Sequence, residues 1–305
     1  MTGEGGDSRE RSGDVGSTGS GGVRTDGGER ARTGFAPSAR LGEPLVKGLL
    51  VVVLAFFTVP IVLTIVTSLA TSAEGVLPSG LATFESWRQV LGFGDFGVRR
   101  DVRSDLVFSM GLATGGMAIN LLVGVPIAYA LTRYEFPGRR ALNVFAILPL
   151  VPGVILGIAF LRAYPQNASS WFGLVTGYAL LKSPFMVLTV QSSFQSMDLE
   201  RLEESARSLG ASWPRTFLTV IVPNAKNGII AGCIITWTLA AAEFNFTYMV
   251  HGRGPRPFSL FLFENISNSP VTQSAAAISI YFLVVVGAIL VLQLLGNRGF
   301  TTTRE

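Results

Sequence analysis

The sequence predicts an all-α integral membrane protein with six transmembrane helices, and three observations support this fold class. Charged residues make up only 14% of the 305 residues, whereas a soluble domain usually has about 25%. Apolar residues make up 49%, and the mean hydropathy is +0.46. The apolar residues are gathered into long runs, and a run of about 20 can cross a bilayer as a helix. Such a chain requires lipid rather than water around much of its surface.

Six apolar runs are long enough to span a membrane, although the fourth contains Lys182 and Pro184. Several runs carry glycines four residues apart. This spacing either lets helices approach closely in lipid or reflects the general abundance of glycine in such helices. The predicted spans are residues 48–70, 106–131, 141–161, 171–194, 227–250 and 274–296, and the glycine pairs are Gly111/Gly115, Gly153/Gly157, Gly173/Gly177 and Gly228/Gly232.

The chain is expected to have four parts. Residues 1–42 are polar and Gly-rich, so we expect a disordered cytoplasmic tail that cannot bury enough surface to fold. Residues 43–104 hold the first transmembrane helix and an external loop. Residues 105–297 form the main helical core with an inner loop at 196–224, and residues 298–305 form a short cytoplasmic C-terminus.

The distribution of basic residues predicts the orientation in the membrane. With the N-terminus inside, sixteen Lys and Arg residues fall in inner segments and seven in outer segments, and Lys182 lies within a span. Cytoplasmic segments carry the excess of Lys and Arg. The short inner loop Arg133–Arg140 is the clearest part of this bias. We therefore expect a multi-pass protein of the cell membrane with both termini in the cytoplasm.

Several function classes are excluded by composition. The single cysteine, Cys233, and the single histidine, His251, do not supply a disulfide framework, a metal cluster or a His-based triad. His251 is expected to lie at the membrane interface. No Gly-x-x-x-x-Gly-Lys-Ser/Thr loop is present for binding nucleotide phosphates. We therefore expect no catalytic residue, no cofactor and no metal. We also expect no nucleic-acid partner, because the basic residues are spread along the chain, as membrane topology requires.

The inner loop before the fifth span predicts two short helices. Asp198 is suited to an N-cap, and Gly210 is suited to the positive φ that follows a helix. Leu199, Leu202, Ala206 and Leu209 recur at helical spacing and share one face, with Glu203 and Glu204 beside it. A second helix is expected from Ser212 to Pro223, with Pro214 in its first turn. An amphipathic helix pair on the membrane surface would show the same pattern.

This loop resembles the EAA loop of ABC importer permeases, which has the pattern Glu-Ala-Ala, three residues, Gly, nine residues, Ile-x-Leu-Pro. The corresponding residues here are Glu204-Ser205-Ala206, Gly210, Val220, Val222 and Pro223. Both spacings match, with Ser205 in place of Ala and Val in place of Ile and Leu. The resemblance covers residues 105–296. The segments Ala130–Gly138 and Phe258–Ala277, with Ser269-Pro270, resemble the spermidine/putrescine branch of the family.

The resemblance implies a type I importer fold, in which the chain forms the translocation pathway and hydrolyses no ATP itself. The loop would dock on a cytoplasmic ABC ATPase dimer, and a second permease subunit and an extracytoplasmic solute-binding protein would complete the importer. The ATPase-coupling residues would be Glu203, Glu204, Ala206, Gly210, Val220 and Pro223. The substrate stays open among polyamines, thiamine, iron and sulfate-type anions, since the binding protein chiefly selects it.

Two ionisable residues lie within predicted spans, Lys182 in the fourth and Glu243 in the fifth. An ionised group at mid-bilayer costs several kcal/mol unless it faces a polar cavity or a partner. Both residues, with Asn245, are therefore candidates for the substrate pathway, and a carboxylate there would suit a polyamine. Alternatively, Lys182 and Glu243 pair with each other and stabilise the bundle.

Two other functions remain as alternatives. A secondary transporter driven by an ion gradient often has inverted repeats and broken helices in both halves. The sequence contains no visible repeat, and this function leaves the EAA-like loop unexplained. The second alternative is a membrane scaffold without transport activity, for which no appended domain is visible.

Overall fold

The computed structural model describes residues 38–74, 77–80, 82–92, 102–147, 152–252 and 256–298. The chain divides into two units, Met1–Leu54 and Ala55–Glu305. Of the first unit, the structure describes only the opening part of helix α1 (Ser38–Ser68). Helix α1 includes residues 38–42 of the expected tail, and residues 1–37 lie outside the described residues. An apolar run locates the part of a helix that crosses lipid but not the residue at which the helix begins.

The regular secondary structure described in the second unit is helical except for one small hairpin. Strands β1 (Ser72–Glu74) and β2 (Leu77–Ser79) pair antiparallel, with Ser72 opposite Ser79. The helices that follow the hairpin are α2 (Glu85–Val90), α3 (Val102–Ile119), η1 (Asn120–Gly124), α4 (Val125–Arg133), α5 (Arg139–Ile147), α6 (Gly153–Ala163), α7 (Trp171–Gln195), α8 (Leu199–Ser208), α9 (Trp213–Thr216), η3 (Phe217–Ile221), α10 (Val222–Asn224), α11 (Lys226–Ala241), α12 (Asn245–Val250), α13 (Phe258–Asn265) and α14 (Val271–Arg298).

Four of the six predicted spans are helices long and apolar enough to cross a bilayer: Pro44–Ser68, Val102–Arg133, Trp171–Gln195 and Val271–Leu294. The second of these joins α3, η1 and α4 without interruption, and η1 is a π-helical segment at its middle. These helices confirm the predicted fold class of an all-α membrane protein.

The other two predicted spans are each built from two shorter helices. Residues 141–161 divide into α5 and α6, and residues 148–151 between them lie outside the described part of the chain. Pro152 immediately precedes α6, and the residue before a proline is biased away from helical geometry. The predicted fifth span divides into α11 and α12, which are separated by Ala242–Phe244. The chain also turns by 75° just before this span, between Trp213–Asn224 and α11.

Helices of the second unit approach each other closely at glycines. A Cβ atom added to Gly177 of α7 would lie 2.0 Å from the ring of Phe246 on α12. One added to Gly228 of α11 would lie 2.4 Å from Cβ of Ser193 on α7. Both glycines belong to the pairs predicted from sequence to allow close helix approach, and small residues at such contacts let backbones approach in lipid.

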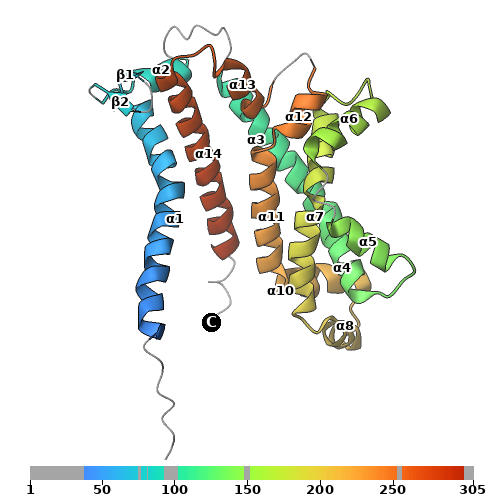
Figure 1. Ribbon diagram of the computed structural model, residues 1–305. Helices are drawn as coiled ribbons and strands as arrows, with labels where there is room; N and C mark the ends of the chain where they lie inside the picture. The colour runs from blue at the N-terminus through green and yellow to red at the C-terminus, as the bar shows by residue number, and fades with distance from the viewer. Residues whose placement is uncertain are drawn as a thin grey trace, which may run out of the picture. The chain divides into compact units, whose positions relative to one another are not determined.

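Figure 1 shows α8 and α10 at one end of this helical unit, beside the end of α4, and α12 and α13 at the opposite end. The buried core extends in the same direction, from the α8 end of the unit toward the α12 end. One cluster joins α4, α7, α8 and the segment 217–229 near the first end, and a second joins α3, α7, α11 and α12 at the middle. The predicted coupling loop and the predicted intramembrane charges therefore lie in different parts of the unit.

Candidate functional site: the inner loop and the interrupted fifth span

The first helix of the inner loop has the ends that the sequence predicts. The Asp198 side chain accepts a hydrogen bond from the Arg201 amide at 3.2 Å, which caps the start of α8. Gly210 has a φ of +76°, as expected. The amides of Gly210 and Ala211 donate to the carbonyls of Arg207 and Ala206. These two bonds form a Schellman motif, which ends the helix sharply.

Some of the predicted coupling residues are exposed on this loop, and others are buried within the chain. Glu204, Gly210 and Pro223 are exposed, and Val220 is half-buried. Glu203 and Ala206 are buried within this chain, each only 6% exposed. The exposed members are therefore the ones whose side chains or backbone a partner could contact.

Leu209 departs from the predicted apolar face. Leu199 and Ala206 are buried as expected, but Leu209 at the end of α8 is 87% exposed. The helix has ended by this residue, which is the C-cap of α8. Its side chain therefore lies off the face that packs inward, and it gives the loop an apolar projection near Gly210.

Glu203 is held by two residues from the end of the second span. It accepts hydrogen bonds from the hydroxyl of Tyr129 and from Nε of Arg133, the latter at 3.1 Å. Arg133 also binds the carboxylate of Glu200 at 2.9 Å. A buried carboxylate needs a charged or hydrogen-bonding partner, and Glu203 has both.

Tyr129 also joins the other helices around the loop, a role that the sequence analysis missed. Its ring packs against Phe194 of α7 and Phe217 of η3, with centroid distances of 5.9 and 5.2 Å. Trp213 of α9 lies 6.0 Å from the same ring and stacks on Phe217. In the sequence, Tyr129 is surrounded by apolar residues. This pattern indicates that its side chain is buried, but it does not indicate which residues the side chain contacts.

The two intramembrane charges form an ion pair. Nζ of Lys182 on α7 donates to Oε2 of Glu243, and the two side chains are 12% and 6% exposed. The other carboxylate oxygen of Glu243 accepts the amide hydrogen of Phe246 at 3.0 Å. Asn245, the third pathway candidate, is exposed on α12 and takes no part in this pair. The structure therefore brings Lys182 and Glu243 together and leaves Asn245 outside.

Glu243 lies at the break between α11 and α12. Backbone carbonyls at this break accept hydrogen bonds from side chains of other helices. The carbonyl of Glu243 accepts from Ser259 on α13 at 2.9 Å and from Tyr178 on α7 at 3.4 Å. The hydroxyl of Tyr281 on α14 donates to the carbonyl of Ala241. Irregular backbone at membrane depth is tolerated where protein groups or water satisfy it. These three positions were not singled out from sequence.

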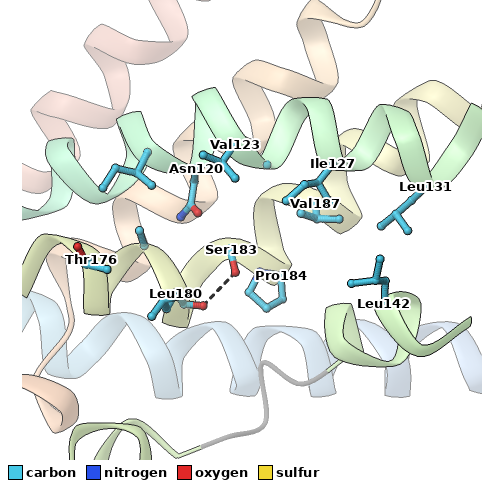
Figure 2. Close-up of a pocket in the computed structure, with 13 residues that line it drawn as sticks. Asn120, Val123, Ile127, Leu131, Leu142, Thr176, Leu180, Ser183, Pro184 and Val187 are labelled. Carbon is cyan, nitrogen blue, oxygen red and sulfur yellow. Dashed lines mark hydrogen bonds between the residues drawn. The ribbon is translucent and has the colours of Figure 1, made fainter. Parts of the chain in front are cut away.

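Pro184 lies inside the continuous helix α7, beside an apolar groove. Proline cannot donate to the carbonyl four residues earlier. The hydroxyl of Ser183 instead donates to that carbonyl, of Leu180, at 3.0 Å (Figure 2). The groove has a volume of about 290 Å³ and lies between α7 and the segment around Asn120. Its lining is mainly aliphatic, which does not suit a charged solute. Within the described residues, no group of His, Cys, Asp and Glu could hold a metal ion.

Comparison with known proteins identifies the family. Residues 104–298 match the family described as "Binding-protein-dependent transport system inner membrane component". The chain is 31% identical to the molybdate/tungstate transport system permease protein WtpB of Thermococcus kodakarensis, over 62% of this chain and 77% of that protein. It is 33% identical to a probable sulfate transport system permease protein of Nephroselmis olivacea, over 45% of this chain and 53% of that protein.

A solved structure has the same fold. The bacterial ABC transporter involved in import of the acidic polysaccharide alginate is 17% identical, with a TM-score of 0.64, over 88% of this chain and 99% of that chain. The expected polyamine branch is not supported, because the relatives carry the names of molybdate/tungstate and sulfate permeases. The family match supports a membrane setting and a separate ATPase. This chain belongs to the binding-protein-dependent transport system inner membrane components, the permease subunits of ABC importers.

Proposed function

We propose that this chain forms the translocation pathway for a small tetrahedral oxyanion, of which molybdate, tungstate and sulfate are examples. The names of its relatives support this substrate class. The ion pair of Lys182 and Glu243 removes the main argument for a polyamine, because the Glu243 carboxylate is already neutralised by a lysine. An uncompensated carboxylate in the pathway would have attracted a cation and repelled an anion.

The inner loop couples this pathway to a cytoplasmic ATPase dimer. The single observation that carries the coupling role is the loop itself. It has a helix with defined caps, a glycine at φ +76° and an exposed Glu204, at the spacing of the EAA pattern. ATP-driven closure of the ATPase dimer would push this rigid element and change which side of the membrane the pathway faces.

We propose that the complete importer contains further subunits. A second permease subunit completes the pathway, and an extracytoplasmic binding protein delivers and selects the solute. The exposed Asn245 on α12 lines the pathway, where its neutral amide can donate to an oxyanion without holding it tightly. Both termini lie in the cytoplasm, which places the α8 end of the unit toward the ATPase.

Uptake measurements test this function. Cells with and without this chain are supplied with labelled molybdate, sulfate or putrescine, and ATP-dependent accumulation is measured. Loss of the chain is expected to abolish accumulation of at least one oxyanion and to leave putrescine uptake unchanged. Loss of putrescine uptake alone would contradict the oxyanion proposal. Oxyanion uptake that persists after removal of ATP would instead favour an ion-driven transporter.

A further inference from the structure

We infer that Glu203 is a positioning residue that ties the coupling helix α8 to α4, so that α4 moves with the loop as one body. The inference rests on the proposed coupling function but concerns a different side of the loop. The chain connects the loop directly to α7 and α11 only. The link to α4 is made by side chains, across about 70 residues of sequence.

The contacts of Glu203 attach α8 to α4 and do not form a surface on which a partner could dock. Its side chain is 7% exposed, so a partner protein cannot reach the carboxylate without displacing α4. Both carboxylate oxygens lie within 3.2 Å of Nε of Arg133. The hydroxyl of Tyr129 donates to one of them, and this tyrosine is itself 2% exposed. Charge-assisted bonds of this kind have fixed geometry and are stronger than neutral ones.

Both halves of the loop are attached to the same residue of α4. Glu203 of α8 binds the hydroxyl of Tyr129, while Phe217 of η3 packs against the ring of the same tyrosine. Phe194 at the end of α7 packs against another side of that ring. A displacement of α8 therefore cannot leave Tyr129 in place without breaking buried polar contacts, and α4 is expected to follow the loop.

The second span contains a segment at which its two halves could turn relative to each other. The π-helical residues 120–124 separate α3 from α4, and Pro126 follows at the start of α4. π-Bulges and prolines are the usual sites of helix bending. Motion of the loop would thus reach the middle of the membrane through α4, in addition to the two spans that flank the loop in sequence.

Distance measurements test the link directly in the complex that co-purifies with this chain. In a Cys233→Ser background, spin labels are placed on Ser208 of α8 and Ile127 of α4, both of which are exposed. A second pair joins Ser208 to Val107 of α3, which is 71% exposed. Distances are recorded without nucleotide and with MgATP and vanadate. We expect the first distance to stay constant between the two states and the second to change.

A change in the distance between α8 and α4 overturns the inference, because the two helices would then move separately. A constant distance between α8 and α3 also overturns it, because the loop would then not move relative to the outer half of the span. Failure of any ATPase to co-purify would instead contradict the proposed function. The two failures are therefore distinguishable.

A matched pair of variants tests the role of the carboxylate in transport. Glu203→Gln keeps the shape of the side chain and removes its charge. Glu200→Gln removes the same charge from the same helix, where the side chain is 72% exposed. We expect Glu203→Gln to retain the ATPase but to import about tenfold less substrate per ATP hydrolysed, since it breaks a buried pair. Glu200→Gln is expected to stay within about twofold, since an exposed pair contributes little.

A Glu203→Gln complex with the ratio of import to hydrolysis unchanged would overturn the positioning role. If Glu203→Gln does not assemble, Tyr129→Phe replaces it, because this change removes one hydrogen bond and keeps the ring packing. Full coupling in Tyr129→Phe, together with a moving distance between α8 and α4, would likewise overturn the inference.

Discussion

Lys182 of α7 and Glu243 of the break between α11 and α12 form a buried ion pair within the membrane-spanning part of the chain. The pair accounts for both charges that the sequence placed inside predicted spans. Each oxygen of the Glu243 carboxylate has its own partner, Lys182 for one and the amide of Phe246 for the other. Both charges are therefore satisfied by groups of this chain, and the Phe246 bond ties the pair to the start of α12.

The first prediction follows from this pairing. Lys182→Met or Glu243→Gln alone leaves the other group without its partner, and removing one member of a buried pair costs about 3–5 kcal/mol. We expect each single variant to lower the thermal midpoint and the yield of folded protein, measured by fluorescence-detected size exclusion. The double variant Lys182→Met/Glu243→Gln should recover much of the loss. Additive losses would show that the two residues act independently.

The second prediction concerns helix packing. Gly177→Val places a side chain into the ring of Phe246, which is fully buried. Overpacking a core costs about 1–3 kcal/mol, so we expect a lower thermal midpoint and a reduced yield. Gly287→Val is the matched control, because a Cβ at this glycine in α14 meets nothing within 4 Å. Equal stability of the two variants would mean that α7 and α12 do not pack as described.

Local signals predicted the loop and most of the helices. Asp198 caps the start of α8 and Gly210 follows its C-cap, so both lie next to the helix in sequence and indicate where it begins and ends. The four full-length spans likewise follow from their apolar runs. Sequence reasoning failed where the deciding partner is distant. Glu203 and its neighbour Glu204 look alike in sequence, but Arg133 makes only Glu203 a buried residue.

The break in the fifth span has the same explanation. An apolar run from 227 to 250 predicts one continuous helix. The interruption at Ala242–Phe244 is stabilised by hydroxyls of Ser259 and Tyr281, which lie on α13 and α14. Neither residue is distinguishable in sequence from an ordinary polar residue of a membrane helix. The polyamine branch, which rested on the resemblance of Ala130–Gly138 and Phe258–Ala277, is not supported by the names of the relatives. The carboxylate that would have suited a polyamine, Glu243, is paired with Lys182.

The third prediction concerns orientation. Cysteine at Ser267, after α13, should react with a membrane-impermeant maleimide added to intact cells, in the Cys233→Ser background. Cysteine at Ser212, between α8 and α9, should react only after the membrane is opened. Both positions are exposed in the structure, so burial does not explain a difference between them. Labelling of Ser212 in intact cells would place the loop outside the cell, away from any cytoplasmic ATPase.

The last prediction tests the docking side of the loop. Glu204 is exposed, so Glu204→Lys should leave the folded protein intact. Gly210→Val forces a β-branched residue toward a φ of +76°, at a cost of about 1–2 kcal/mol, although a Cβ there meets nothing within 4 Å. We expect both variants to reach the membrane at near-normal levels and to lose most ATPase co-purification and oxyanion uptake. Ser208→Ala is the control, since it changes an exposed hydroxyl that bonds only within its own helix. Full assembly and full uptake in both variants would make the loop an ordinary surface helix pair, and the coupling role would have to lie elsewhere in the chain.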